Sequence, residues 1–277
     1  MPPPHYGYNV AEYGTTSSPR RKPGDTIDLM AEPARRPQDA APTPGSPAWW
    51  SARAVPPPER GRGRPPRSFE NIVSVAADLV DEFGVDGVNM RLLAERLGTG
   101  TATLYRHVTG KDELMVYVLD SRMGEIVGAY DALVGGPRTW REALERIAFA
   151  YRGFLVAHPN VLPLLVGRLP IGPHALAIRE RSLAALTERG FSQELAARAF
   201  TTLLQYVVGS AVTQAGSPAP DEAAAIRDYY RSLDAAAYPH VAAAAEALTH
   251  TPSEAGFAEG LEIVLDGIDR IRWRSAR

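Results

Sequence analysis

Residues 94–114 read AERLGTGTATLYRHVTGKDEL, and this stretch decides the fold of the region around it. The apolar spacing predicts a helix over 90–97, which ends where Gly98 and Gly100 interrupt it. A second helix is predicted over 101–107, directly after the glycine turn. Two short helices joined in this way have the outline of a helix-turn-helix unit.

A longer helix is predicted to precede this pair. Ser68 stands at the position of an N-cap, and Gly84 follows the apolar stripe as a stop signal. The stripe recurs at three- and four-residue steps and marks one buried helix face. It consists of Phe69, Ile72, Val73, Ala76, Leu79, Val80 and Phe83.

Residues 68–114 resemble the tetracycline-repressor (TetR) family of transcriptional regulators. The family pattern runs Ala-x-x-Leu-Gly, a four-residue turn, Thr-Leu-Tyr-x-His-Phe/Val, and a lysine that opens the next helix. Ala94–Gly98, Thr103–Val108 and Lys111 match that pattern. The resemblance implies an all-helical DNA-binding regulator that pairs as a homodimer and answers to a small-molecule effector.

One position departs from the family pattern. The family usually has Val-Ser between the turn glycine and the recognition helix, where this chain has Thr99-Gly100. Loss of the serine cap costs about 1 kcal/mol at the start of that helix. Thr101 is the alternative cap.

Helix geometry and the resemblance together give a set of predicted DNA contacts. A major groove about 12 Å wide accepts one helix, whose first residues reach the base edges. Small side chains at the start of 101–107 let the backbone approach DNA closely. The resemblance turns Tyr105 toward a phosphate, and Lys111 is a second phosphate contact at a helix N-terminus. The predicted contacts are Thr99, Thr101, Ala102, Thr103, Tyr105, His107 and Lys111.

Each prediction has a structural alternative. Leu104 and Val108 are expected to be core residues. Tyr105 could be a half-buried core tyrosine, and Lys111 a plain solvated lysine. For His107 a packed or capping role is favoured over a phosphate contact.

Charge is unevenly distributed along the chain. Residues 68–115 carry four Lys or Arg against eight Asp or Glu, whereas residues 1–67 carry ten against six. Phosphate neutralisation supplies nearly all non-specific DNA affinity. The helix-turn-helix unit is acidic, so the positive charges that bind phosphate are expected to come from another part of the chain. A flexible arginine arm before the first helix is the predicted source, with a solubilising tail as the alternative. Its arginines are Arg60, Arg62, Arg64 and Arg67.

The remaining sequence predicts an all-α fold. No segment alternates with period two over more than a few residues, and glycines and prolines separate helical stretches. These further helices are predicted at 111–133, 138–157, 160–166, 174–189, 192–215, 221–234 and 253–274. The expected organisation is a helix-turn-helix domain at 67–114 and a helical ligand-binding and dimerisation domain at 115–277.

Residues 1–66 are predicted to be disordered. They hold 15 of the 24 prolines and few of the aliphatic residues that build a core. Trp49 and Trp50 are the apolar exception. The favoured interpretation is an incidental pair in a tail, and the alternative is docking on the folded body or on a partner.

Two late helices are candidates for pairing with a second subunit. Residues 192–215 and 253–274 each carry an apolar stripe with small residues in it, and such a stripe is expected to pack against another helix. The resemblance implies that these helices form a four-helix bundle across a two-fold axis. Packing within one chain is the alternative. The predicted interface residues are Leu195, Ala199, Leu203, Tyr206, Phe257, Leu261, Val264 and Ile268.

A small-molecule pocket is predicted on the central helices, where aromatic bodies alternate with a few polar tips. Plain core packing is the alternative for each residue. The candidate lining is Tyr151, Phe154, His158, Leu162, Leu165, Arg168, Thr202, Gln205 and Tyr206. Nothing in the sequence names the ligand.

Catalysis and metal binding find no support in the sequence. The chain has no cysteine, its six histidines show no H-x-x-x-H spacing, and no phosphate loop or nucleophile elbow is present. We therefore predict a non-enzyme without cofactor, located in the cytoplasm and without a membrane span.

Three partners are expected: a palindromic double-stranded DNA operator, an unidentified effector and a second copy of the chain. The most natural role is a repressor released by its effector. The alternative function is a helical ligand- or protein-binding module that has lost DNA binding.

Overall fold

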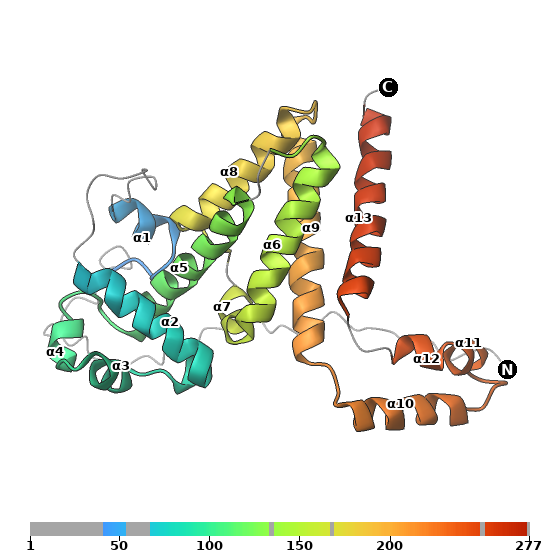
Figure 1. Ribbon diagram of the computed structural model, residues 1–277, viewed down its shortest axis with the longest axis horizontal. Coiled ribbons are helices and arrows are strands. Elements are labelled where there is room, and N and C mark those ends of the chain that lie inside the picture. The colour runs from blue at the N-terminus through green and yellow to red at the C-terminus, as the bar shows by residue number, and fades with distance from the viewer. Residues whose placement is uncertain (1–40, 54–66, 133–135, 167–168, 250–252, 276–277) are drawn as a thin grey trace, which may run out of the picture. The chain divides into compact units, whose positions relative to one another are not determined.

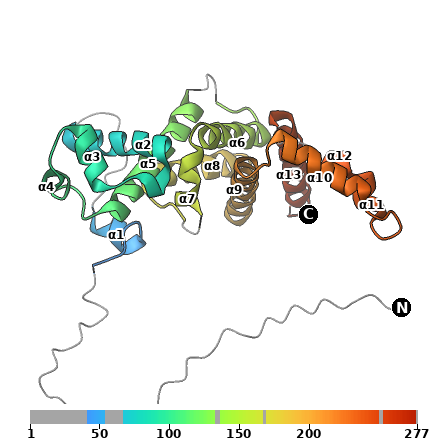
Figure 2. The ribbon, with the colours of Figure 1, turned by 90° about the horizontal axis from the view of Figure 1, so that it is seen from below.

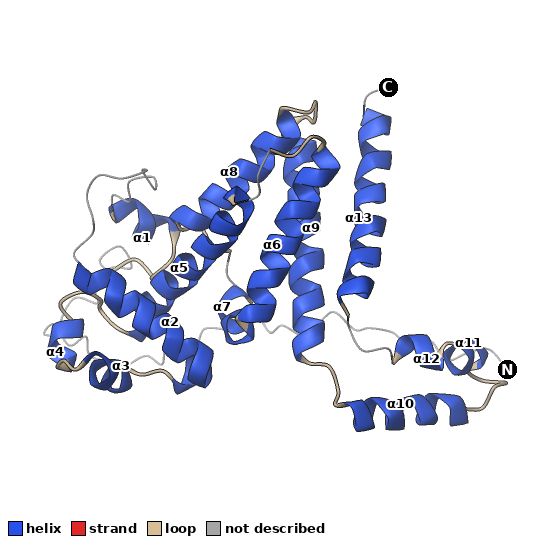
Figure 3. Cartoon of the chain, viewed as in Figure 1, coloured by secondary structure: helices blue, strands red, loops and turns tan. Residues whose placement is uncertain are grey.

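The computed structural model describes residues 41–53, 67–132, 136–166, 169–249 and 253–275. Within these ranges every regular element is helical and no strand occurs, which confirms the all-α prediction (Figures 1 and 3). The elements are α1 (Pro47–Ala52), α2 (Arg67–Gly87), α3 (Met90–Leu97), α4 (Thr101–Leu104), α5 (Lys111–Asp131), α6 (Trp140–Ala157), the 3-10 helix η2 (Pro159–Val161), α7 (Leu162–Leu165), α8 (Pro173–Thr187), α9 (Gln193–Ala215), α10 (Pro220–Ser232), α11 (Pro239–Ala243), α12 (Ala245–Leu248) and α13 (Glu254–Ser275).

The apolar face of α2 is buried as its spacing predicts. Ile72 and Val73 are buried, and Leu79 is fully so, while Phe83 at the end of the stripe is 47% exposed. Gly84 has a φ of 71°, outside the helical region, yet the helix resumes and runs to Gly87. Two helical segments therefore meet at a kink at Gly84, the position of the predicted stop, where glycine tolerates the positive φ.

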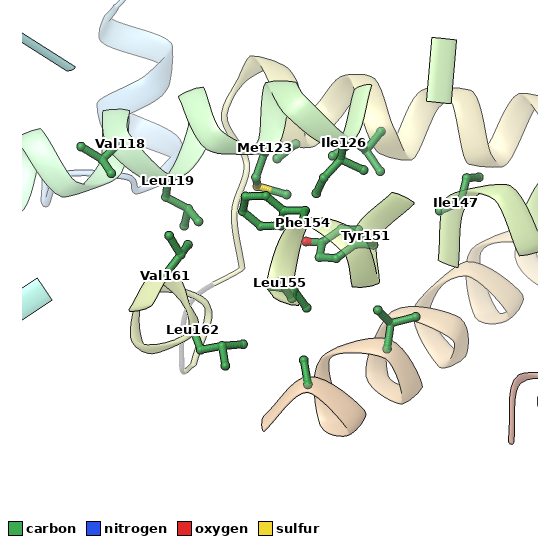
Figure 4. Close-up of a cluster of buried hydrophobic side chains, with 14 of the residues drawn as sticks. Val118, Leu119, Met123, Ile126, Ile147, Tyr151, Phe154, Leu155, Val161 and Leu162 are labelled. Atoms are coloured by element: carbon green, nitrogen blue, oxygen red, sulfur yellow. The ribbon is translucent and has the colours of Figure 1, made fainter. Parts of the chain in front are cut away.

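Helix α5 is the central support of the fold. It packs against α2, the first helix of the helix-turn-helix region, and also against α6 and α8. One continuous hydrophobic core consequently runs from Ile72 in α2 to Ile268 in α13. Figure 4 shows the middle of this core, where Val118, Leu119, Met123 and Ile126 of α5 lie near Tyr151, Phe154 and Leu155 of α6.

Among the described residues, α9 is the one helix whose length and hydropathy would suffice to cross a membrane. It packs against α6, α8 and α13, and its Leu203 and Val207 are completely buried. Core helices of large helical domains reach the same length and composition, and α9 is such a helix here.

The face of α9 predicted to bind a second subunit packs against α13 of the same chain. Tyr206 donates a 2.6 Å hydrogen bond to the carbonyl oxygen of Phe257, and the two rings stack with centroids 5.3 Å apart. Gly260 makes room for that ring, because a Cβ at this position would overlap the Tyr206 hydroxyl oxygen.

The predicted interface therefore needs correction. Tyr206 and Val264 are partly buried within the protomer, and the other predicted residues are buried completely or nearly so. Side chains already covered inside one chain are unavailable to another. The buried members are Leu195, Ala199, Leu203, Phe257, Leu261 and Ile268.

A short helix, α1, lies within the segment predicted to be disordered. Ser46 caps it by accepting a 3.2 Å hydrogen bond from the backbone N–H of Trp49. Trp49 is only 2% exposed, and its ring lies 5.3 Å from that of Tyr117 in α5. The incidental-pair interpretation is thus wrong, and docking on the folded body is what occurs. The predicted tail residues 1–40 and 54–66 lie outside the described residues.

Helices α10, α11 and α12 pack on one another, and both ribbon views show them together (Figures 1 and 2). Glu246 of α12 pairs with Arg227 at 3.4 Å and with Arg231 at 2.7 Å, both on α10. The sequence predicts α10 at 221–234 but neither of the two short helices after it. Those helices owe their order to contacts with α10 that the local sequence does not reveal.

Candidate nucleic-acid interface and ligand cavity

Helix α3 and the turn after it are defined by their caps. The side chain of Asn89 accepts hydrogen bonds from the N–H groups of Arg91 at 3.1 Å and Leu92 at 2.9 Å. Gly98 ends the helix with φ 64° and ψ 33°, in the left-handed region that favours glycine. These two residues fix where the chain turns toward α4.

Helix α4 is shorter than the predicted 101–107. It starts at Thr101, but its N-cap is Gly100, which offers no side-chain hydrogen bond. Thr101 is therefore inside the helix and is not the alternative cap. After Leu104 the chain continues as turns, in which the N–H of His107 bonds to the Leu104 carbonyl at 2.9 Å. A helix with β-branched residues and no capping bond is easily shortened.

Within α4 the side chains separate cleanly into two faces. Thr101 and Ala102 are exposed and Thr103 is partly so, whereas Leu104 is fully buried in the hydrophobic core. Tyr105 is 54% exposed, which excludes the core-tyrosine alternative. The outward face therefore carries small side chains followed by a phenol, as a groove-reading helix requires.

The other predicted contacts surround this face with different partners. Thr99 is exposed in the turn. His107 is partly buried and its ring lies 6.3 Å from that of Phe69, in agreement with the favoured packing role. Lys111 begins α5, and its ammonium contacts the carbonyl oxygen of Asp86 at 3.4 Å. Lys111 is thus tied to the end of α2.

One residue on this face was missed by the sequence reasoning. Arg106 is exposed, and its guanidinium donates to Oγ1 of Thr103 at 3.3 Å. The sequence did contain a signal for it, because a basic residue directly after Tyr105 stands out in a unit that is otherwise acidic. Arg106 places a positive charge next to the small residues of α4.

The acidic side chains of the unit are largely engaged in ion pairs. Asp78 and Asp81 both pair with Arg122 of α5, at 3.1 and 2.5 Å. Glu82 pairs with Arg96 at 2.8 Å. Arg122, which lies outside the unit, brings one positive charge to Asp78 and Asp81, so it offsets their negative charge only in part.

The predicted arginine arm is almost entirely outside the described residues. Arg60, Arg62 and Arg64 fall in the undescribed range, and for Arg67 only the backbone, at the start of α2, is described. The described residues that flank this range are Arg53, after α1, and Arg67, at the start of α2. Arg53 contacts Glu113, and α2 is the first helix of the helix-turn-helix unit, so both flanking residues lie at that unit.

His158 belongs to a polar cluster between α2, α5 and α6, away from the cavity described below. Its Nδ1 lies 3.0 Å from Asp81 and its Nε2 lies 3.0 Å from Glu125, while Asn160 donates to the Asp81 carbonyl at 2.9 Å. Burial would raise the pKa of Glu125, but hydrogen bonds from Arg122 and His158 outweigh it and hold the pKa below its usual value. The prediction that His158 lines a ligand pocket is corrected accordingly.

A cavity of about 600 Å³ opens between α5, α6, α8 and α9. Its volume lies within the range of drug-sized ligand sites. Most of its wall is aliphatic or aromatic, with four polar side chains among them. It is lined by Met123, Tyr151, Leu165, Leu169, Pro170, Ala175, Ile178, Arg179, Leu183, Ala197, Phe200, Thr201, Leu204, Gln205 and Val208.

Two polar groups of the wall have perturbed acidities. Burial raises the pKa of Tyr151 to about 12, so its hydroxyl remains protonated at neutral pH. Burial also lowers the pKa of Arg179, whose guanidinium donates to the carbonyl oxygens of Pro170 at 2.6 Å and Ala175 at 3.2 Å. The cavity thus offers a hydroxyl donor and a cation within an apolar wall.

The predicted pocket residues fall into three groups. Tyr151, Leu165 and Gln205 line the cavity. The others described lie elsewhere: Phe154 and Leu162 are buried in the core, His158 is in the polar cluster, Thr202 is exposed, and Tyr206 packs on α13. Arg168 falls outside the described residues. Three of the predicted residues thus line this cavity, and the α8 residues of its wall, Arg179 among them, were not predicted.

In the part of the chain that the structure describes, no group of three or more His, Cys, Asp or Glu side chains is placed to hold a metal ion.

Two family models match the chain. The model for bacterial regulatory proteins of the tetR family matches residues 72–118, and the model for the tetracyclin repressor-like C-terminal domain matches residues 135–272. The first match covers the helix-turn-helix region, and the second covers α6, α8 and α9 of the cavity wall but not α5.

Curated relatives agree with these models. The HTH-type transcriptional repressor DrrR1 of Streptomyces coeruleorubidus is 31% identical over 222 residues, which cover 76% of this chain and 80% of DrrR1. The class A tetracycline repressor protein from transposon 1721 of Escherichia coli is 29% identical over 203 residues, which cover 73% of this chain and 90% of that protein.

Solved structures show the same fold. Apo ActR from Streptomyces coelicolor superposes with a TM-score of 0.66 at 31% identity, over 74% of this chain and 96% of that one. The TetR family protein ActR in complex with actinorhodin gives a TM-score of 0.65 at 30% identity, with the same coverage. Both family models, a repressor of comparable length and these structures agree, and the chain is a member of the TetR family of transcriptional regulators.

Proposed function

We propose that the chain is a repressor that binds a palindromic DNA operator as a homodimer and is released by a small-molecule effector. The outward face of α4 carries this proposal. Small residues at Thr101 and Ala102 are exposed, the phenol of Tyr105 follows them, and the aliphatic residues of the same turn point into the core. Such a helix can enter a major groove with its first turn against the bases.

The contact set on DNA follows from this geometry. Thr101, Ala102 and Thr103 face base edges, while Tyr105 and Lys111 contact phosphates on either side. Thr99 adds a hydroxyl in the turn. We add Arg106 to the set, because its exposed guanidinium lies beside Thr103. Its long reach suits a phosphate or a guanine edge.

A homodimer is supported by the uncovered faces of α9 and α13. Ile263 is 75% exposed on α13, and a Cβ at Gly267 would meet open space. On α9, Val212 is 44% exposed and Gly209 is likewise open. These apolar and small residues replace the buried stripes as our proposed interface, since small residues allow helices of two subunits to approach closely.

The cavity suggests the chemistry of the effector. A mostly apolar wall with one cation fits a flat, largely apolar molecule whose carbonyl or acidic oxygen faces Arg179 and whose hydrogen-bond acceptor faces Tyr151. The binding of actinorhodin by the related ActR supports a ligand of this general kind.

Selection of duplexes from a random-sequence pool tests the DNA-binding proposal directly. We expect the full chain to enrich an inverted repeat whose half-sites lie one or more helical turns apart. Light scattering at micromolar concentration should give the mass of two chains. Failure to retain any duplex at low salt would favour the alternative, a helical binding module without DNA function. A monomeric mass would remove the dimer from the proposal.

The arginine arm needs a test that leaves α1 in place. A truncation to residue 68 would also remove α1, so we choose the triple variant Arg60→Gln, Arg62→Gln, Arg64→Gln. Two or three phosphates per subunit correspond to a loss of about 4–5 units in the slope of log affinity against log salt. A triple variant at exposed arginines outside the helix-turn-helix unit, Arg138→Gln, Arg198→Gln, Arg274→Gln, removes the same charge elsewhere. Equal slopes for parent and arm variant would make the arm a solubilising tail.

The effector site is tested with 1-anilinonaphthalene-8-sulfonate, a flat aromatic anion. Its fluorescence should rise on binding, and Arg179→Gln should weaken that binding by tenfold or more, at about 1.4 kcal/mol per tenfold. Arg138→Gln, an exposed arginine just before α6 that is not among the residues lining the cavity, is the control. Equal affinities for the two variants would contradict the assigned cation.

A further inference from the structure

Helix α1 docks on the DNA-binding unit through a cluster of aromatic rings. The ring of Trp49 lies 4.7 Å from Trp50 and 5.3 Å from Tyr117 of α5, and Tyr117 in turn lies edge-on to Phe69 of α2 at 4.9 Å. Gly45, just before α1, has a φ of 81°, and a Cβ at this position would lie only 3.1 Å from the Val116 side chain. α1 is therefore closely fitted to α5, and Tyr117 of α5 connects it to Phe69 of α2.

Arg53, the C-cap of α1, makes the polar half of this contact. Its guanidinium lies 3.9 Å from the centre of a Trp49 ring. Nε donates to the Tyr117 hydroxyl at 3.2 Å, and Nη2 donates to Oε1 of Glu113 at 2.6 Å. The planar fork of an arginine can satisfy two acceptors in different directions at once, which a lysine cannot do.

Glu113 continues the connection toward the recognition helix. Its other oxygen, Oε2, accepts from the backbone N–H of Thr109 at 2.8 Å and from the Thr109 hydroxyl at 2.5 Å. Thr109 follows Val108, which is buried beneath the turn that leaves α4. Burial of Glu113 would raise its pKa, but the bonds from Thr109 and Arg53 outweigh it and keep the pKa below its usual value.

We propose that α1 is a clamp for the recognition helix, in which Arg53 is a positioning residue that acts through Glu113 and Thr109. Arg53 supplies the cation that allows Glu113 to stay ionised while only 3% exposed. The ionised carboxylate holds Thr109, and Thr109 holds the end of the 101–110 segment. The role of the clamp in reading DNA rests on the function proposed above.

The free protein provides the first test. We compare amide hydrogen exchange in the full chain with that in Arg53→Ala and Arg53→Lys. Loss of a charged hydrogen bond should speed exchange in residues 101–110 by roughly tenfold or more, while α9 exchanges at the parent rate. Arg198→Ala, an exposed arginine of α9 with a loose 3.7 Å pair to Glu194, is the matched control. Unchanged exchange at 101–110 in Arg53→Ala would overturn the clamp.

The duplex selected by the parent protein provides the second test. Arg53→Ala should lose roughly tenfold in affinity with an unchanged salt slope, and Arg53→Lys should not restore the affinity. A direct phosphate contact would behave differently: the slope would fall by about 0.9 per subunit, and lysine would substitute well. That result, or faster exchange with parent affinity, would overturn Arg53 as a positioning residue.

Tyr117→Phe is a milder variant that keeps the test valid if the Arg53 variants fail to fold. It removes only the hydroxyl that accepts from Arg53, so it should shift exchange and affinity in the same direction by a smaller factor. A parent that selects no duplex would count against the proposed function alone. The exchange comparison would then still decide whether α1 holds residues 101–110.

Discussion

The helix-turn-helix unit carries its candidate binding side chains on its outer surface, whereas the helices around the cavity carry theirs in the interior. In α4, Thr101 and Tyr105 point outward, and Leu104 between them points into the core. Around the cavity the polar groups point inward, and Tyr151 is only 3% exposed. A substitution on the outward face should therefore change binding with little effect on folding. A substitution in the interior should change stability first, whatever it does to a ligand.

The largest expected effect is a loss of folding stability when a buried leucine is truncated in either region. Leu104→Ala and Leu203→Ala each remove a completely buried side chain, and each should lower the free energy of unfolding by about 2–5 kcal/mol. Guanidinium titration at fixed protein concentration measures this loss. Ala102→Ser, exposed beside Leu104, is the control and should stay within about 0.5 kcal/mol. A Leu104→Ala variant as stable as the parent would show that α4 is not seated in the core.

A pair of helical glycines, Gly260 of α13 and Gly153 of α6, gives the next effect. Gly260→Ala pushes a methyl group against the ring of Tyr206 and breaks its bond to Phe257. We expect a net loss of about 1–2 kcal/mol. Gly153→Ala, outside the proposed dimer interface, meets open space and should gain up to about 1 kcal/mol from helix propensity. Equal thermal shifts for the two variants would contradict the close packing of α9 and α13.

Tyr105→Ala should weaken DNA binding without unfolding the protein. Loss of a phosphate contact lowers affinity for all sequences alike, by about 1 kcal/mol. Tyr229→Ala, a 62% exposed tyrosine of α10, controls for removal of a surface ring. Fluorescence anisotropy with selected and random duplexes gives both affinities, and circular dichroism checks helicity. Parent-like binding by Tyr105→Ala would show that the recognition face is wrongly placed.

Thr103→Ala should change which sequence is bound rather than how tightly any sequence is bound. If Thr103 touches a base edge, its loss relaxes discrimination by roughly 1 kcal/mol at one base pair. Competition with single-position operator variants measures this. A uniform loss across all positions would instead assign Thr103 to phosphate contact or to orienting Arg106.

The smallest expected effect is a pH dependence inside the regulatory part. The pKa of His174 is raised, chiefly by its hydrogen bond to Asp120, whose carboxylate lies 3.1 Å from Nδ1. A raised folded-state pKa means that protonation favours folding. The stabilisation is complete below about pH 6.5 and is lost as pH rises through the raised value.

Melting temperatures test this dependence. The difference between the parent and His174→Gln should shrink from about pH 6 to about pH 8.5. The Gln variant removes the titrating ring and leaves the bonds from the α8 backbone to Asp120 available. A difference that stays constant or grows over this range would contradict the assigned pKa direction.

The sequence by itself determined the elements whose signals are local. Asn89 and Gly98 set the ends of α3 because a cap acts within one turn, and the stripe on α2 specified its buried face. The motif around Thr103 and Tyr105 carried the resemblance to the TetR family, because its residue types stand at fixed spacings along the chain. The family followed from those few residues.

Only the tertiary structure decided which face of each later helix meets which neighbour. An apolar stripe shows that a helix face is covered, but it does not show which element covers it. The stripes on α9 and α13 were compatible with a dimer interface, and in the structure the two helices pack against each other within one chain. The cavity depends on α8, whose Arg179 reaches the site only because α5, α6 and α9 surround it. Docking of α1 was equally hidden, because this six-residue helix in a proline-rich segment is held through Arg53 by Glu113 and Tyr117, which lie 60 and 64 positions further along the chain.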